Sequence, residues 1–271
     1  TLSASEVIVA AATNAADKAA LEALYAATAG ANWTNATGWL VGDPATWFGV
    51  TVVGSRVTEI DLNANNLVGT LPSSLGNLAA LEVLDLGTNR CSGGIPGTLG
   101  GVATLRVLDL SENDLTGAIP SALGSAAALT TIRLYSNNLT GSIPSSLGAL
   151  PLLDRLNLDG NKLTGAIPAS FSSASNLTFL SLTGNTLSGA VPGLSATSLN
   201  ELYLGSNGFS GSAPALPAMI THLVLSNNAF DALGDFSGGG FPGLTTLAVE
   251  GNQLDFDDLL PNLGFPSGTY S

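Results

Sequence analysis

The sequence predicts an α/β solenoid, in which short repeats stack in a right-handed array with a parallel β-sheet along the concave side. Asparagine recurs nine times, with successive differences of 24, 24, 24, 24, 24, 22, 21 and 24 residues. Each of these asparagines ends a frame of the form LxxLxLxxN. A period of this length is typical of a repeat architecture. The asparagines are Asn65, Asn89, Asn113, Asn137, Asn161, Asn185, Asn207, Asn228 and Asn252.

Each frame contains one short β-strand. In Leu84-Asp85-Leu86 the apolar side chains alternate with a polar one, so one face of the strand is buried. One repeat cannot bury its leucines alone, whereas stacked neighbours share a continuous core. With strands about 4.8 Å apart, nine of them extend over roughly 40 Å.

The recurrent asparagine has a structural role in this prediction. The chain turns inward at this position, and the turn leaves backbone donors and acceptors without partners. An amide side chain supplies both a donor and an acceptor, which neither Asp nor Leu does. We therefore expect the nine asparagines to form a hydrogen-bonded ladder, and we assign them no ligand.

A second pattern follows the asparagine, as in NDLTGAIPSAL from Asn113 and NNLTGSIPSSL from Asn137. Here the sequence resembles the plant-type leucine-rich repeats of receptor ectodomains and polygalacturonase-inhibiting proteins, whose 24-residue unit carries LxGxIP. The resemblance covers residues 57–256 and implies an irregular or 3-10 helical convex side. It implies no particular ligand, because such repeats are reused for unrelated partners. The matching pairs are Leu71-Pro72, Ile95-Pro96, Ile119-Pro120, Ile143-Pro144, Ile167-Pro168, Val191-Pro192 and Ala213-Pro214.

The ends of a solenoid need caps, because an uncovered core would face water. We expect residues 1–56 to form the amino-terminal cap, residues 57–256 to hold nine repeats and residues 257–271 to form the closing cap, all in one continuous domain.

The amino-terminal cap is expected to combine a helix with aromatic residues. Residues Asp17 to Thr28 predict a helix that stops near Gly30. The segment TWFGVTV resembles the cap of the plant family, with Val52 where a cysteine is usual, so the cap disulfides are missing. The apolar helix face is Ala20, Leu21, Leu24 and Tyr25, and the aromatic cover of the first repeat is Trp33, Trp39, Trp47 and Phe48.

The composition limits the partners. Seven basic residues against twenty acidic ones give a formal net charge of −13, which repels phosphate backbones and anionic membrane surfaces, so we expect no nucleic acid and no membrane insertion. Cys91 is the single cysteine and fills a slot that is leucine in other repeats, which predicts a small core residue. We expect a secreted or cell-surface protein whose signal peptide or anchor is not in this chain.

Catalysis is not expected. A Ser or Cys triad needs a histidine base, and His222 is the single histidine, at a variable position of the concave side. Residues 238–243 formally match GxGxxG, but no predicted strand precedes them, so a dinucleotide site is not indicated. Asp255, Asp257 and Asp258 lack the spacing of a calcium loop. We expect no cofactor and no catalytic residue.

Acidic residues line the concave positions of the first three strands. A solvated strip that steers a partner is the favoured interpretation, and a bound cation is the alternative; we assign no metal. The residues are Glu59, Asp61, Asp85 and Asp109.

Cationic and aromatic residues follow on strands four to eight. Exposed aromatics beside arginine are over-represented in binding hot spots, and on this face they have no core to fill. We therefore expect this strip to bind a protein or glycan, with the protein itself a monomer. The residues are Arg133, Tyr135, Arg155, Phe179, Tyr203 and His222.

A column of hydroxyl residues supports a second hypothesis. Regularly spaced hydroxyls along an uncharged edge could order water, and some plant-type repeat proteins bind ice; an adhesion or scaffold role would use similar Thr, Ser and Asn arrays. The same hydroxyls could instead tie adjacent turns together by hydrogen bonds. The column is Val68, Ser92, Thr116, Thr140, Thr164, Ser188 and Ser210.

Overall fold

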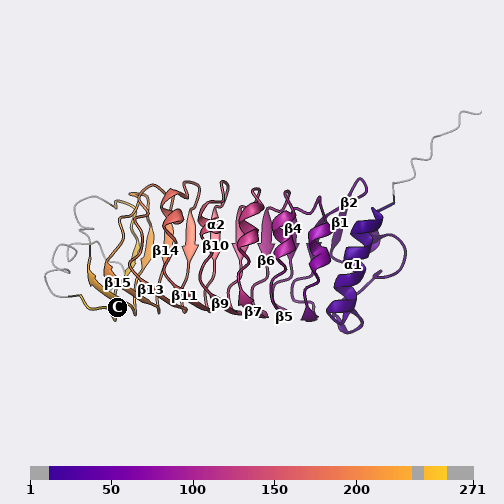
Figure 1. Ribbon diagram of the computed structural model, residues 1–271, viewed down its shortest axis with the longest axis horizontal. Helices are drawn as coiled ribbons and strands as arrows, with labels where there is room; N and C mark the ends of the chain where they lie inside the picture. The colour runs from indigo at the N-terminus through magenta and orange to yellow at the C-terminus, as the bar shows by residue number, and fades with distance from the viewer. Residues whose placement is uncertain (1–11, 234–240, 255–271) are drawn as a thin grey trace, which may run out of the picture.

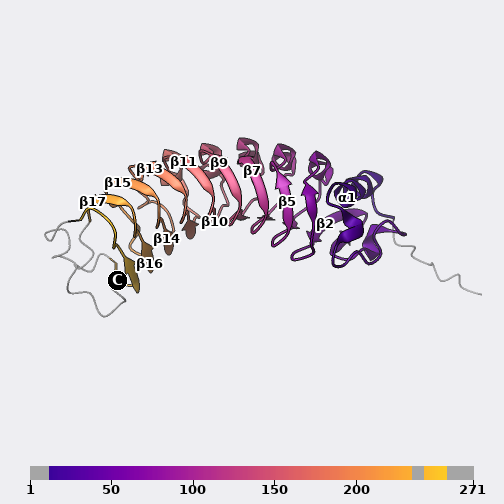
Figure 2. The same ribbon diagram turned by 90° about the horizontal axis from the view of Figure 1, so that it is seen from below.

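The structure, a computed structural model that describes residues 12–233 and 241–254, is a curved stack of repeats with a helical cap at its amino-terminal end (Figure 1). A ten-stranded sheet runs along the concave side, and an eight-stranded sheet runs along the flank that faces the viewer in Figure 2. The ten strands, in spatial order, are β1 (Val50–Val53), β2 (Arg56–Asp61), β4 (Val83–Asp85), β6 (Val107–Asp109), β8 (Thr131–Arg133), β10 (Arg155–Asn157), β12 (Phe179–Ser181), β14 (Glu201–Tyr203), β16 (His222–Val224) and β18 (Thr246–Ala248).

The concave sheet confirms the predicted parallel array. From β2 to β18 each strand pairs in parallel with the next, with Leu84 beside Ile60 and Leu108 in one unbroken register. These leucine positions are fully buried, and each such side chain contributes about 1.5–3 kcal/mol. The antiparallel strand β1, which forms a hairpin with β2, was not predicted; it covers the edge of β2 that would otherwise present unpaired backbone groups.

The flank sheet was not predicted, since one strand was expected in each repeat and the resemblance implied only an irregular or 3-10 helical convex side. In NDLTGA the side chain of Leu115 is fully buried and that of Thr116 is exposed, so this segment also alternates with a period of two. Stacking at the strand spacing then lets neighbouring copies pair in parallel. The strands are β3 (Val68–Thr70), β5 (Arg90–Gly93), β7 (Asp114–Ala118), β9 (Asn138–Gly141), β11 (Lys162–Gly165), β13 (Thr186–Gly189), β15 (Gly208–Ser212) and β17 (Ala229–Ala232).

Short helical turns line the convex side, as predicted. Each of these turns has a proline as its N-cap residue, such as Pro120 before η5, whose backbone is still extended. Each turn buries one apolar side chain such as Leu123. The turns are η3 (Ser73–Asn77), η4 (Gly97–Gly101), η5 (Ser121–Ser125), α2 (Ser145–Gly148) and η6 (Ala169–Ser173).

The cap helix α1 (Ala15–Ala27) begins two residues earlier than predicted, because the Asn14 side chain accepts a hydrogen bond from the Ala16 amide. The buried carboxylate of Asp17 joins this helix to the first repeat: it pairs with Arg56 at 2.9 Å and accepts from the Val57 amide. The cap also contains η1 (Gly30–Asn32) and η2 (Pro44–Thr46).

The aromatic cover is a cluster of three buried tryptophans. Ring centroids lie 4.7 Å apart for Trp33 and Trp39 and 4.9 Å apart for Trp39 and Trp47. The prediction was wrong for Phe48, whose side chain is 41% exposed. In the described part of the chain no helix is long and apolar enough to cross a membrane. The expected closing cap, residues 257–271, and the run 238–240 lie outside the described residues.

Candidate functional site

The concave sheet aligns the predicted binding residues on its solvent side. Residues that flank the buried leucines of each strand point away from the core, and the parallel register places equivalent positions in columns. Arg155 pairs with Phe179, and Phe179 pairs with Glu201, across neighbouring strands. We call Arg133, Tyr135, Arg155, Phe179 and Tyr203 the concave strip.

One hollow of about 130 Å³ lies within the concave strip. Four of the six residues predicted for binding contribute to its wall. The other two lining residues, Ile132 and Asn157, were not predicted. The lining residues are Ile132, Arg133, Tyr135, Arg155, Asn157 and Phe179.

Stacked side chains extend the hollow toward β14. The guanidinium of Arg155 lies 4.3 Å from the ring centroid of Phe179, within the range of a cation–π contact. The Phe179 ring in turn lies 5.7 Å from that of Tyr203, tilted by 45°. The three side chains therefore form a continuous surface row across β10, β12 and β14.

Both tyrosines of the concave strip are fixed by glutamates. The Tyr203 hydroxyl donates to Glu201 at 2.9 Å, and the Tyr135 hydroxyl donates to Glu112 at 3.2 Å. Burial, together with the hydrogen bond to Glu201, raises the pKa of Tyr203 to about 12. The sequence could have revealed Glu201, since it lies two residues before Tyr203 on one strand and so shares its face, whereas Glu112 belongs to the preceding repeat.

His222 lies apart from the hollow. It pairs in register with Glu201 rather than with Tyr203, and its Nδ1 lies 2.9 Å from the Thr221 hydroxyl. His222 lies on a strand of the concave sheet, as expected, but it does not line the hollow.

The acidic residues lie in register, but they are not one solvated strip. On neighbouring strands, Asp61 of β2 pairs with Asp85 of β4, and Asp85 pairs with Asp109 of β6. Asp109, however, is 6% exposed, accepts from the Ser111 hydroxyl and amide, and pairs with Arg133 at 3.2 Å. The expectation of a solvated Asp109 was therefore wrong, because the arginine of the next strand and a local serine enclose it.

The remaining acids of this group are more accessible. Glu59 accepts a hydrogen bond from Thr51 on β1, and Asp61 is exposed. Partial burial raises the pKa of Asp85, the Gly87 amide lowers it, and the charge of Asp109 raises it further. Among the described residues, no cluster of histidine, cysteine and acidic side chains is arranged to hold a metal ion.

The asparagine ladder connects successive repeats. Asn137 accepts from the Leu115 amide at 3.0 Å, and its Nδ2 donates to Leu110 at 2.9 Å and Leu134 at 3.1 Å. Equivalent bonds recur from Asn89 to Asn252, while Asn65 at the start bonds instead to Asn35 of the cap. These side chains are used by the fold and are not available to a ligand.

The hydroxyl column lies on the flank sheet. Thr116, Thr140, Thr164 and Ser188 are exposed. Ser92 donates to the Gly69 carbonyl at 3.3 Å, which is a hydrogen bond between adjacent turns of the kind expected for this column. The four exposed residues face solvent, so tying the turns does not account for the whole column.

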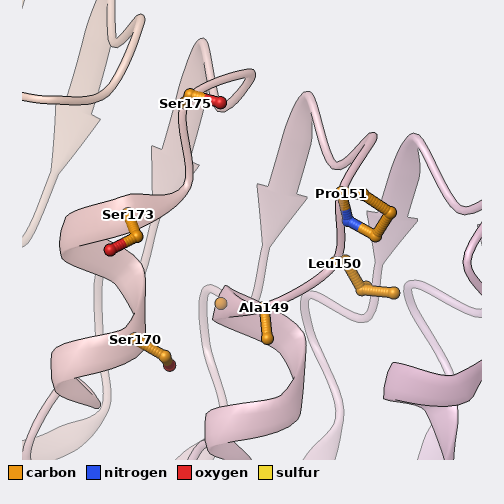
Figure 3. Close-up of a pocket in the computed structure, with 7 residues that line it drawn as sticks. Ala149, Leu150, Pro151, Ser170, Ser173 and Ser175 are labelled. Atoms are coloured by element: carbon orange, nitrogen blue, oxygen red, sulfur yellow. The ribbon is translucent and has the colours of Figure 1, made fainter.

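A second hollow, of about 280 Å³, lies between two neighbouring repeats, where the end of α2 and the residues after it face η6 (Figure 3). The side chains of Ala149 and Pro151 come from one repeat and those of Ser170, Ser173 and Ser175 from the next. The lining contains neither a charged nor an aromatic side chain, so it offers fewer specific contacts than the smaller concave hollow.

Comparisons with known proteins agree with the repeat pattern. The family model for leucine-rich repeats matches residues 55–115, 104–163 and 127–187. A comparison with curated proteins found no match.

Three solved structures show the range of similarity. PEPR1 in the PEPR1-AtPEP1 structure has a TM-score of 0.82 and 34% identity, over 88% of this chain and 35% of that chain. A plant ice-binding protein has a TM-score of 0.73 and 25% identity, over 95% and 91%. The BIR2 ectodomain from Arabidopsis thaliana has a TM-score of 0.56 and 32% identity, over 65% and 94%. The chain thus spans about a third of the first structure's length.

Proposed function

The chain belongs to the leucine-rich-repeat family, and we propose that it is an extracellular recognition module that binds a protein partner on its concave strip. The hollow carries this proposal, because it gathers Arg133, Tyr135, Arg155 and Phe179 at one place on the solvent side of the sheet. Arginine and tyrosine are enriched among residues that dominate binding energy.

The concave strip is also pre-organised. Arg155 rests on Phe179, and the hydroxyls of Tyr135 and Tyr203 are held by glutamates. Side chains that are already ordered lose less conformational entropy when a partner binds. The exposed Asp61 on β2 and the half-buried Asp85 on β4 lie on the same sheet, with β6 between them and this strip, and would influence the approach of a charged partner.

The comparisons support a protein partner outside the cell. The first structure is named for two components, PEPR1 and AtPEP1, and the BIR2 structure is named as an ectodomain. We propose secretion or display at the cell surface, and a monomer as the binding form. The experiment below distinguishes a protein partner from a glycan partner.

Affinity capture with two matched variants tests the proposal. Tyr135→Ala, Phe179→Ala and Tyr203→Ala together should abolish capture of partners from extracellular fluid. Thr116→Gln, Thr140→Gln and Thr164→Gln together change the flank and should leave capture intact. Equal capture by the concave variant, or partners that are released by glycosidase treatment, would contradict protein binding at the concave strip.

Ice binding is a second candidate, favoured by the match to a plant ice-binding protein over almost the whole of both chains. The surface it would use is the flank sheet, where Thr116, Thr140 and Thr164 are exposed on strands that repeat at about 4.8 Å. Thermal hysteresis and ice-crystal shaping that are lost in the flank variant and kept in the concave variant would support it. Absence of both effects in the unmodified protein would rule it out.

A further inference from the structure

The free polar atoms of the concave hollow are mostly hydrogen-bond donors. Arg133 and Arg155 contribute guanidinium N–H groups. The Asn157 Oδ1 already accepts from the Asp159 amide at 3.0 Å, which leaves its Nδ2 to donate. The lining includes no carboxylate. From this we propose that the hollow binds the carboxylate of an acidic side chain from within the partner's chain, an inference that rests on the proposed function.

Arg155 has the geometry for such a group. Its Cζ lies over the Phe179 ring at 4.3 Å from the centroid, so the aromatic ring holds the guanidinium at the wall of the hollow. The described residues contain no acidic side chain within 4.0 Å of it. A planar guanidinium held in this way can donate two parallel hydrogen bonds to one carboxylate.

Arg133 adds a second cation that is only partly neutralised. One of its N–H groups faces Asp109 at 3.2 Å, and its side chain is still 42% exposed. Asp109 therefore positions Arg133 at the wall of the hollow while other N–H groups stay free. Among the described residues, Asp109 is the one carboxylate within 4.0 Å of either guanidinium, and the nearby carboxylates of Glu112 and Glu201 accept hydrogen bonds from Tyr135 and Tyr203 instead.

The size and place of the hollow indicate a side chain rather than a chain terminus. Its volume of about 130 Å³ suits the end of one side chain, since a water takes about 30 Å³ in the liquid. It lies on β8 and β10, the fourth and fifth of nine parallel strands, and the sheet continues in both directions. A partner that follows the sheet crosses the hollow rather than ending there. Asp61 and Asp85 on the preceding strands disfavour a polyanion.

Small carboxylates test this without an identified partner. Three probes are titrated into isotopically labelled full-length protein: N-acetyl-glutamate α-amide, with only a side-chain carboxylate; N-acetyl-glutamine, with only an α-carboxylate; and neutral N-acetyl-glutamine α-amide. We expect the first to shift the side-chain Nε–Hε signals of Arg155 and Arg133 and the amides of β8 and β10. Equal shifts from the neutral probe, or none from the first, would overturn the proposal, and a stronger effect of N-acetyl-glutamine would assign the site to a chain terminus instead.

Arginine variants complete the test. Arg155→Gln should abolish the shifts on β8 and β10, Arg155→Lys should weaken them because the flat fork is lost, and Arg106→Gln, a change to an exposed arginine elsewhere, should leave them unchanged. The amide spectrum of each variant reports whether it is folded. If the Arg155→Gln variant is unfolded, the proposal is tested by comparing the probe-induced shifts of Arg155→Lys with those of Arg106→Gln. Loss of partner capture in the aromatic variant together with no probe binding would retain the proposed function and refute this inference alone.

Discussion

The guanidinium of Arg133 lies 3.2 Å from the carboxylate of Asp109 on the neighbouring strand. Asp109 is the last acidic residue of the first three strands, and Arg133 is the first residue of the concave strip, so this ion pair joins the two groups of residues. Asp109 is nearly buried and Arg133 is half exposed, so the pair combines a desolvated anion with a cation that still faces solvent.

Asp109→Asn should lower the free energy of unfolding by about 1 kcal/mol. The amide keeps an acceptor for Ser111 but loses the charge that pairs with Arg133. Urea unfolding measures the change. Asp61→Asn, at the equivalent exposed position of β2, is the matched control and should stay within about 0.5 kcal/mol of the unmodified protein. Equal losses in both variants would show that the ion pair is unimportant.

Asn137→Ala should destabilise the protein far more than Asn138→Ala. Asn137 is 6% exposed, and its removal leaves the Leu115 amide and the Leu110 and Leu134 carbonyls without this partner, at roughly 1–3 kcal/mol for each group that stays unpaired. Asn138 lies in β9 and is only partly buried. Thermal unfolding compares the two variants, and equal melting temperatures would contradict the role of the ladder.

The sequence was sufficient for features that depend on a residue's place within one repeat. Leu84 and Asn89 each depend on the local alternation and turn, so repeating the frame was enough to predict the concave strands and the ladder. The flank sheet depends on the same alternation at Leu115 and Thr116, which was not interpreted as a second strand. Gly117 has φ of 78°, a conformation that interrupts a regular strand, yet the neighbouring copies still pair.

The site was less predictable, because its contacts join different repeats. The burial of Asp109 depends on Arg133, 24 residues later, and the position of Tyr135 depends on Glu112, 23 residues earlier. A single repeat contains neither relationship. The register of Asp61, Asp85 and Asp109 followed from the repeat, whereas the contacts between side chains of different repeats depend on side-chain length and rotamer.

Cys91 should be unreactive in the folded protein. Its side chain is 1% exposed, and burial raises the pKa of its thiol to about 12, so little nucleophilic thiolate forms at mildly alkaline pH. We expect labelling by a disulfide reagent to be slow in buffer and complete in guanidinium chloride. Rapid labelling under native conditions would place the thiol at the surface instead of in the leucine slot.

Asp159 should make stability depend on pH. Burial raises its pKa above 3.8, although hydrogen bonds from Ser181 and the Thr183 amide oppose this. Between its folded-state pKa and 3.8, the folded protein binds more protons than the unfolded chain, so the free energy of unfolding increases as the pH falls through this window. Asp159→Asn should remove that increment relative to the unmodified protein in urea unfolding at a series of pH values. An identical pH profile for the variant would contradict the assignment.

Glu201→Gln should lower the pKa of Tyr203 from about 12. Burial is the largest cause of the raised value and persists in the variant, so the pKa should fall only part of the way toward 10. The substitution removes the negative charge beside the phenolate and weakens the hydrogen bond that now holds the hydroxyl at 2.9 Å. Ultraviolet titration of the phenolate band measures the shift, with Tyr203→Phe to identify the step and circular dichroism to confirm that the protein stays folded. Glu112→Gln is the control, because Glu112 accepts a hydrogen bond from Tyr135 and not from Tyr203. If the pKa of Tyr203 falls equally in both glutamate variants, the net charge of the concave face sets that pKa, and the contact with Glu201 does not.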